Sequence, residues 1–289
     1  MPSPSFLKIG GVPEHFNLPW ILALEKNKFR SLSVEISWNF YPGGTGAMTQ
    51  ALKTGELDIA ILLTEGFIAS YYQGLSAKII HPYIQSPLQW GIYSGIHNEL
   101  AIHEHTKIAI SRKGSGSHLM SMLHAQQLGV QLNEEQFVVV HHLEDAIESL
   151  KSGHCDYFYW EHWMTLKYVK RAEIHQVGRF SAPWSGFLVV ASETCLAKYP
   201  EALHAIIEII NTEVRAFIAD PNTPSNIAHR FQLNLEESAE WLGNQKWNFH
   251  PLISKKEIEL TMDSLRQIGQ PVGSSFPDHI TAPWLQWKE

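Results

Sequence analysis

The sequence is poor in cysteine and has no long run of apolar residues. Its two cysteines, Cys155 and Cys195, are far apart in a chain of 289 residues, so their spacing indicates neither a disulfide framework nor a cysteine zinc cluster. No segment approaches the roughly 18 apolar residues of a membrane span. The opening MPSPSFLKIGG also lacks the charged and apolar regions of a signal peptide. We therefore expect a soluble, cytoplasmic protein, or a periplasmic or lipid-anchored one if a signal peptide has been removed.

Positive charge is also scarce. The chain has 22 Lys and Arg against 29 Asp and Glu, a net charge of -7, and no run of basic residues. Binding to nucleic acid needs a basic face that neutralises phosphates, so we expect no nucleic-acid partner. The apolar and charged fractions, 44% and 18%, are those of a globular protein. We expect a monomer whose partner is a small molecule.

Strands and helices alternate along the chain. A strand at 6–9 leads through a loop to a helix that begins at Pro19, and a strand at 32–40 is followed by a glycine turn, a helix at 47–54 and a strand at 57–63. The segment 106–163 repeats this order around a second glycine turn. Such alternation predicts parallel crossovers and α/β sheets flanked by helices.

Extended stretches lie on both sides of the second unit, at 81–95 and 178–192. A chain that crosses out to a second domain and returns would place its hinge there. We predict a two-lobed α/β protein in which domain I comprises residues 1–90 and 184–289 and domain II residues 91–183, joined by two hinge crossings.

Each predicted α/β unit has a glycine turn in front of a helix. A helix N-terminus has unpaired N–H groups, and glycine allows a ligand to approach them closely. GGTG lacks the Lys of a phosphate-binding P-loop and the third glycine of a dinucleotide fingerprint. Either turn alone could be a plain connection, but two equivalent turns favour a shared cleft. The binding residues predicted here are Gly44, Thr45, Gly46, Ser115, Gly116 and Ser117.

Other candidates for the cleft follow predicted strands or lie in the loops beside them. They are Glu14, His15 and Phe16, then Glu65, then Trp160 and Glu161, and finally Trp184 and Ser185. Ligands of open α/β sheets bind at the carboxyl ends of strands. The alternative is that the two later carboxylates cap helices and the tryptophans fill core volume. Together, aromatic surfaces and carboxylates suit a flat ligand that is cationic or carries an amino group.

Metal binding and nucleophilic catalysis have no support in the sequence. The histidine pairs His103/His105 and His141/His142 lack the helical i, i+4 spacing of zinc enzymes. No Gly-x-Ser-x-Gly elbow is present, and neither cysteine has an identifiable partner. We expect no metal, no cofactor and no catalytic residue.

Four stretches together resemble a known family. VEISWNFYPGGTGAMTQALKTGELDIAIL, IAISRKGSGSHLMS, LEDAIESLKSGHCDYFYWE and GFLVVASETCLAKYPEAL are similar to the type 2 periplasmic-binding-protein fold. Within it they resemble the solute-binding proteins for sulfonates, nitrate and thiamine precursors, and most closely fungal and bacterial members without a secretion signal. The resemblance implies that two lobes close on a heteroaromatic or anionic metabolite, with an ABC permease as partner if the chain is exported. It adds His118 and Trp90 to the binding residues.

The same fold also includes enzymes. The fungal thiamine-pyrimidine synthase has a pyridoxal-phosphate lysine and a consumed histidine where this chain reads DIAILLTEG, with Leu62 and Gly66. Its cysteine-rich iron motif falls at APWSGFL. These departures argue against that chemistry. A cytoplasmic enzyme, of thiamine-pyrimidine biosynthesis or a lyase of the menaquinone-pathway type with Glu65 or Glu161 as acid/base, is the alternative to a binding protein that leaves its ligand unchanged.

Overall fold

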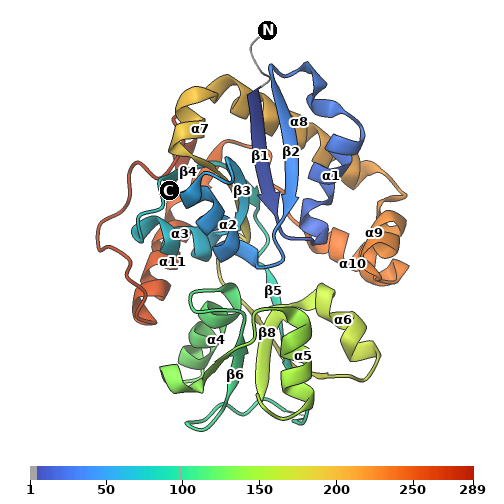
Figure 1. Cartoon of the computed structure of the whole chain (residues 1–289), viewed down its shortest axis with the longest axis vertical. Coiled ribbons are helices and arrows are strands. Elements are labelled where there is room, and N and C mark those ends of the chain that lie inside the picture. The colour runs from blue at the N-terminus through green and yellow to red at the C-terminus, as the bar shows by residue number, and fades with distance from the viewer. Residues whose placement is uncertain (1–4, 98) are drawn as a thin grey trace.

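Two five-stranded sheets organise the computed structural model, which describes residues 5–97 and 99–289 (Figure 1). In spatial order the first sheet consists of β2 (Val34–Phe40), β1 (Ser5–Gly11), β3 (Ile59–Leu63), β10 (Phe187–Ser192) and β4 (Ala77–Ile84). The second consists of β7 (Phe137–Val139), β6 (Ile108–Ile110), β8 (Tyr157–Glu161), β5 (Gln89–Ser94) and β9 (His175–Ser181). We call the first sheet and its helices lobe I, and the second sheet and its helices lobe II.

Helices cover both sheets. Lobe I has η1 (His15–Asn17), α1 (Leu18–Glu25), η2 (Lys28–Ser31), α2 (Gly44–Thr54), α3 (Thr64–Tyr72), α7 (Glu193–Lys198), α8 (Pro200–Ala219), α9 (Thr223–Phe231), α10 (Leu235–Asn244) and α11 (Lys255–Gln267). It also has the short pair β11 (Leu252–Ser254) and β12 (Gln286–Lys288). Lobe II has α4 (Gly116–Gln127), η3 (Glu134–Gln136), α5 (Leu143–Lys151) and α6 (His162–Lys170).

Strand direction follows from the connections. β1 pairs in parallel with β2 and β3, because each is joined to the next by a helical crossover. β10 reaches the sheet from lobe II and runs antiparallel to β3 and β4. β3 reads IAILL and is buried along its whole length, as expected for a strand covered on both faces.

The predicted fold class is confirmed, with mixed sheets flanked by helices in two lobes. The first crossing runs from β4 to β5 and the second from β9 to β10. The two crossings touch, since a Cβ on Gly186 would lie 2.9 Å from the carbonyl oxygen of Ser86. The domain boundaries at 90/91 and 183/184 stay a prediction.

Local differences from the predicted elements have simple causes. α2 begins at Gly44 instead of residue 47, so the helix starts inside the glycine turn, where Gly44 has a φ of 67° that glycine accepts most readily. Cys155 and Cys195 are both buried and unbonded. No helix in the described part of the chain combines the length and apolarity needed to cross a membrane.

Candidate functional site

A cavity of about 200 Å³ lies between the two lobes. Its walls come from the carboxyl ends of strands and the helix N-termini that follow them in both lobes, as expected for an α/β cleft. Nine of the sixteen predicted binding residues line it: Glu14, Gly44, Thr45, Trp90, Ser115, Gly116, Ser117, Trp160 and Glu161.

The first glycine turn forms the lobe I side of the cavity. Thr45 lies in the first turn of α2, and its hydroxyl accepts a hydrogen bond from the N–H of Leu63 at 3.2 Å. Position 66 must be glycine for this approach, because a Cβ there would lie 2.5 Å from the Thr45 methyl group. The Thr45 side chain therefore joins the start of α2 to the end of β3, and the backbone N–H groups at the helix N-terminus remain directed at the cavity.

The second glycine turn forms the opposite side. Ser115 is the N-cap of α4, and its hydroxyl accepts from the N–H of His118. Ser117 accepts a hydrogen bond from the N–H of Ser111 at 3.0 Å, which ties the helix to the end of β6. The ring of His118 turns back into lobe II, where its Nδ1 accepts from the N–H of Gly114 and the ring makes a T-shaped contact with Phe137.

Arg112 joins the two turns. Its guanidinium, on the loop before α4, donates a hydrogen bond to the carbonyl oxygen of Gly43 in the turn before α2. The arginine also covers Gly46, where a Cβ would lie 2.4 Å from the guanidinium Nε. The missing side chain at position 46 thus makes room for a contact between lobes.

Two carboxyl groups line the cavity, one from each lobe. Glu14 follows β1 in lobe I, and Glu161 ends β8 in lobe II. Burial raises the pKa of Glu14 to about 7. Burial, followed by the nearby Glu14 charge, raises the pKa of Glu161 well above its usual range. Glu161 also caps α6, because its Oε2 accepts from the N–H of Met164 at 2.7 Å.

Tryptophan side chains complete the lobe II wall. Trp90 pairs with Glu161 across β5 and β8, so the two side chains emerge on the same face of the sheet. The Trp90 ring packs on the N-terminus of α4, where a Cβ on Gly116 would lie 2.5 Å from it. Trp160 is half-buried and stacks on Phe158 with 5.2 Å between ring centroids. The cavity therefore offers aromatic surface beside carboxyl groups.

The other seven predicted residues do not line this cavity. They are His15, Phe16, Gly46, Glu65, His118, Trp184 and Ser185. His15 and Phe16 are drawn into an aromatic cluster of lobe I, where the His15 ring lies 4.4 Å from Trp241 and the Phe16 ring 4.8 Å from Phe187. The residues that His15 and Phe16 contact come from distant parts of the chain, so the neighbouring sequence does not indicate which way their side chains point.

Glu65, Trp184 and Ser185 form contacts inside lobe I. The indole Nε1 of Trp184 donates to Glu65 Oε2 at 2.9 Å, with both side chains buried. The hydroxyl of Ser185 donates to Glu257 Oε2 at 2.6 Å. These side chains fix the returning crossing against α3 and α11. Trp184 fills core volume, as the structural alternative held, whereas Glu65 pairs with Trp184 instead of capping a helix.

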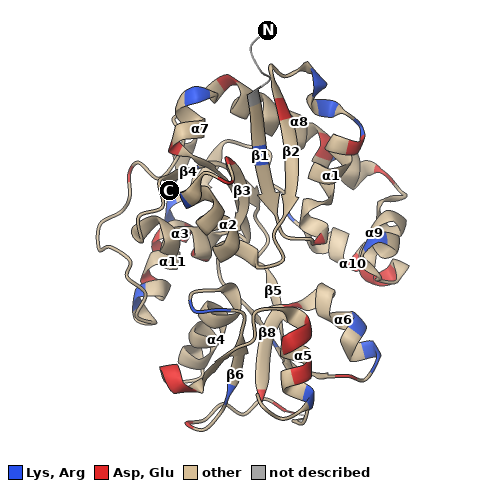
Figure 2. Cartoon of the chain, in the orientation of Figure 1, with Lys and Arg blue, Asp and Glu red and all other residues tan. Residues whose placement is uncertain are grey.

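Several lining residues were missed by the sequence reasoning. They include Leu63, Arg112, His142, Glu144, Met164, Lys167 and Phe187. Arg112, His142 and Glu144 follow the carboxyl ends of β6 and β7, where ligands of open α/β sheets bind, so their positions in the sequence indicate the cavity. In Figure 2 acidic residues gather on α5 and basic residues on α6, two helices of lobe II.

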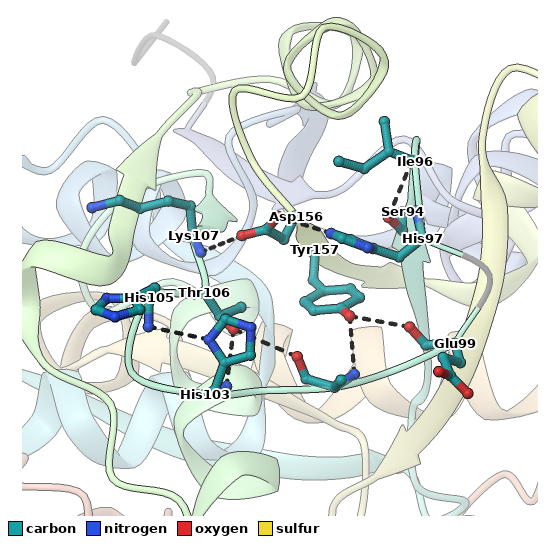
Figure 3. Close-up of polar contacts among 11 residues, drawn as sticks. Ser94, Ile96, His97, Glu99, His103, His105, Thr106, Lys107, Asp156 and Tyr157 are labelled. Carbon is teal, nitrogen blue, oxygen red and sulfur yellow. Dashed lines mark hydrogen bonds and ion pairs between the residues drawn. The ribbon is translucent and has the colours of Figure 1, made fainter.

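The histidine pair His103/His105 lies away from the cavity, in the loop between β5 and β6 (Figure 3). The Nδ1 of His103 accepts from the N–H of His105 at 3.2 Å, and the ring of His97 pairs with Asp156 at 2.9 Å. Tyr157 holds the same loop through Glu99 and the N–H of Ala101. Within residues 5–97 and 99–289, no group of three or more His, Cys, Asp or Glu is arranged to hold a metal ion.

Comparison with solved structures supports the two-lobed arrangement. The chain is similar to the Candida albicans CA3427 gene product, described as defining a new family with the generic periplasmic-binding-protein fold. The two are 28% identical over 96% of this chain and 93% of that one, with a TM-score of 0.84. A model of Ca3427-like periplasmic binding proteins matches residues 90–180. No curated protein matched the sequence.

More distant structures share the fold. The alkanesulfonate-binding protein SsuA from Xanthomonas axonopodis pv. citri, bound to MOPS, is 13% identical over 100% of both chains, with a TM-score of 0.77. A ligand-binding component of an ABC-type import system from Staphylococcus aureus, with zinc bound, is 14% identical over 91% of both, with a TM-score of 0.70. The chain has the type 2 periplasmic-binding-protein fold, and the predicted resemblance to that fold is confirmed.

Proposed function

We propose that this chain binds one small organic molecule in the cavity between its lobes and closes on it without transforming it. The observation that carries the proposal is the Arg112 contact with Gly43, because it joins the two glycine turns across the cavity. Other links also span the lobes, including the Lys170–Glu237 ion pair and the hydrogen bond from Gln126 to Gln267 at 3.2 Å.

The cavity has the features of a ligand site. Its lining combines apolar and aromatic side chains with polar and charged groups from both lobes, and small-molecule sites combine the same two kinds of surface. Relatives of the same fold bind small molecules, including the SsuA protein bound to MOPS. The import-system relative also supports a permease partner for this chain, should it be exported.

A thermal-shift screen with a metabolite library tests this function. We expect compounds that raise the melting temperature of the wild type and are recovered unchanged by mass spectrometry. Trp160→Ala removes a half-buried cavity wall and should abolish the shift. Trp287→Ala removes a comparable half-buried ring on β12, away from the cavity. This variant should show the same thermal shift as the wild type.

The outcomes separate binding from catalysis. Conversion of a stabilising compound would show an enzyme, with the cavity carboxyl Glu161 as the first group to test for acid/base chemistry. Equal responses of the two tryptophan variants would show that ligands bind outside this cavity, and a library without any stabilising compound would contradict the proposal.

A further inference from the structure

One oxygen of Glu161 lacks a partner inside a buried site. The side chain is only 3% exposed and lines the cavity. Its Oε2 accepts the N–H of Met164, but no hydrogen bond reaches Oε1 from the described residues. Burying a carboxyl oxygen without a partner is unfavourable, so such groups are normally paired. The free oxygen therefore indicates a missing hydrogen-bond donor at the cavity wall.

Glu14 brings a second carboxyl group to the same place from the other lobe. As the N-cap of η1 it makes no side-chain capping hydrogen bond. Its charge acts on Glu161 closely enough to raise the pKa of that group. Two carboxylates at close range repel each other, and here they approach only when the lobes are together.

Two cationic side chains, Arg112 and Lys167, line the cavity, but neither forms an ion pair with Glu14 or Glu161 within the described residues. The Arg112 guanidinium donates to Gly43. The Lys167 ammonium lies 5.1 Å from the centre of the Tyr168 ring and forms no ion pair with either carboxyl in the described part of the chain. His15 lies behind Glu161, with 3.9 Å between Nε2 and Oε2, but burial lowers its pKa to about 3 and keeps it neutral. No cationic side chain in the described part of the chain therefore pairs with Glu14 or with the free oxygen of Glu161, and this leaves that place to a ligand.

We propose that the ligand of this cleft carries a protonated nitrogen, as an amidine or an arylalkyl amine does, which binds the free oxygen of Glu161 and the carboxyl of Glu14. The inference rests on the proposed binding function and specifies its ligand class. Trp90 and Trp160 line the same cavity and offer ring faces that attract such a cation.

This arrangement couples the charge of the ligand to lobe closure. In the empty protein, closure brings the two carboxyl groups together and buries them, so at least one of them must take up a proton, and this opposes closure when both are ionised in the open state. A cation bound between the two carboxyl groups makes closure electrostatically favourable, because it interacts with both carboxylates only when the lobes are closed. The ligand thus favours the closed state through its charge, while the helix N-termini and Arg112 determine how the turns meet.

Three probes that share a phenyl ring test the inference: benzamidine, benzamide and benzoate. Benzamidine should raise the melting temperature and bind about tenfold more tightly than the neutral and anionic probes, as expected for a charge-assisted pair. Glu161→Gln keeps an oxygen to cap α6 but removes the charge, and should weaken benzamidine about tenfold. Glu14→Gln removes the carboxylate of the other lobe and should also weaken benzamidine binding about tenfold.

Glu213→Gln is the matched control. Glu213 is also only 3% exposed, but it pairs with Lys26 in lobe I and does not line the cavity. Its variant should bind benzamidine like the wild type, with each protein compared with its own unliganded melting temperature.

The outcomes distinguish this inference from the proposed function. If benzamide or benzoate binds as tightly as benzamidine, or if both cavity variants bind benzamidine normally, the ligand class is wrong. The same holds if no probe binds. The metabolite screen then decides the function separately, since stabilising acids or neutral compounds that depend on Trp160 would leave cleft binding intact. Stabilising compounds that carry a protonated nitrogen and lose their effect in Glu161→Gln would support both.

Discussion

At the scale of single residues, buried carboxyl groups set how stability depends on pH. Glu65 is buried in lobe I, and burial raises its pKa to about 7 although Trp184 donates a hydrogen bond to it. A buried acid that prefers its neutral form binds its proton more tightly in the native state than in the unfolded chain. Glu65 therefore stabilises the protein fully at low pH and loses that contribution as the pH rises.

We predict that Glu65→Gln changes the pH profile of stability. The contribution of Glu65 is fully present below its ordinary pKa of 4.5 and is lost as the pH rises to about 7. Between these two pH values, the free energy of unfolding of the variant should rise relative to that of the wild type by roughly 1.4 kcal/mol per pH unit. Denaturant unfolding at about pH 5 and about pH 7.5 measures the difference.

Other groups titrate in both proteins and cancel in the comparison. His15, His81 and His162 have pKa values lowered by burial, so they add stability as the pH rises through the acid range. Glu201→Gln is the control, because Glu201 is exposed. The free energy of unfolding of this variant should depend on pH in the same way as that of the wild type. A Glu65→Gln profile that is also parallel would mean that Glu65 stays ionised when buried.

At the scale of elements, helix starts have both a structural and a functional role. α4 begins at Ser115, whose hydroxyl accepts from the N–H of His118 and also contacts Ser117 at 3.0 Å. α10 begins with a capping box, in which Asn234 accepts from Glu237 and Glu237 accepts from Asn234. Only the first of these starts lies at the cavity.

We expect Ser115→Ala and Asn234→Ala to lower the free energy of unfolding by a similar amount, about 1 kcal/mol each, because each loses an N-cap. Only Ser115→Ala should also reduce the thermal shift caused by a cleft ligand. Chemical denaturation and ligand titration of both variants measure the two effects. A ligand response lost equally in both would mean that global stability, and not the α4 turn, controls binding.

At the scale of the whole molecule, closure depends on the fit of Arg112 over α2. Alanine at position 46 suits a helix better than glycine, but its Cβ would collide with the guanidinium. Arg112 would have to leave its contact with Gly43. The substitution should therefore weaken the association of the two lobes while it leaves the stability of lobe I unchanged.

We predict that Gly46→Ala keeps the melting temperature of the unliganded protein but increases its radius of gyration and weakens ligand binding. Small-angle X-ray scattering and ligand titration measure these changes. Gly243→Ala is the control, since position 243 is also helical and nothing lies within 4 Å of its Cβ. An unchanged radius together with unchanged affinity in Gly46→Ala would show that Arg112 does not hold the lobes together.

The sequence by itself determined the alternation of strands and helices, the two glycine turns and the fold class. These depend on local signals: apolar runs such as IAILL, glycine where φ is positive, and polar caps at helix starts. It also indicated the cavity positions that directly follow a strand or begin a helix, such as Glu161 and Gly116.

Only the tertiary structure decided which side chains face the cavity. His15 turns to Trp241 and Glu65 to Trp184, partners that are distant in sequence and fill lobe I instead of the cleft. Arg112 reaches Gly43 only because the hinge brings the second lobe over the first. The direction in which a side chain points and the residues that it contacts depend on packing between distant segments. A single sequence contains no local signal for that packing.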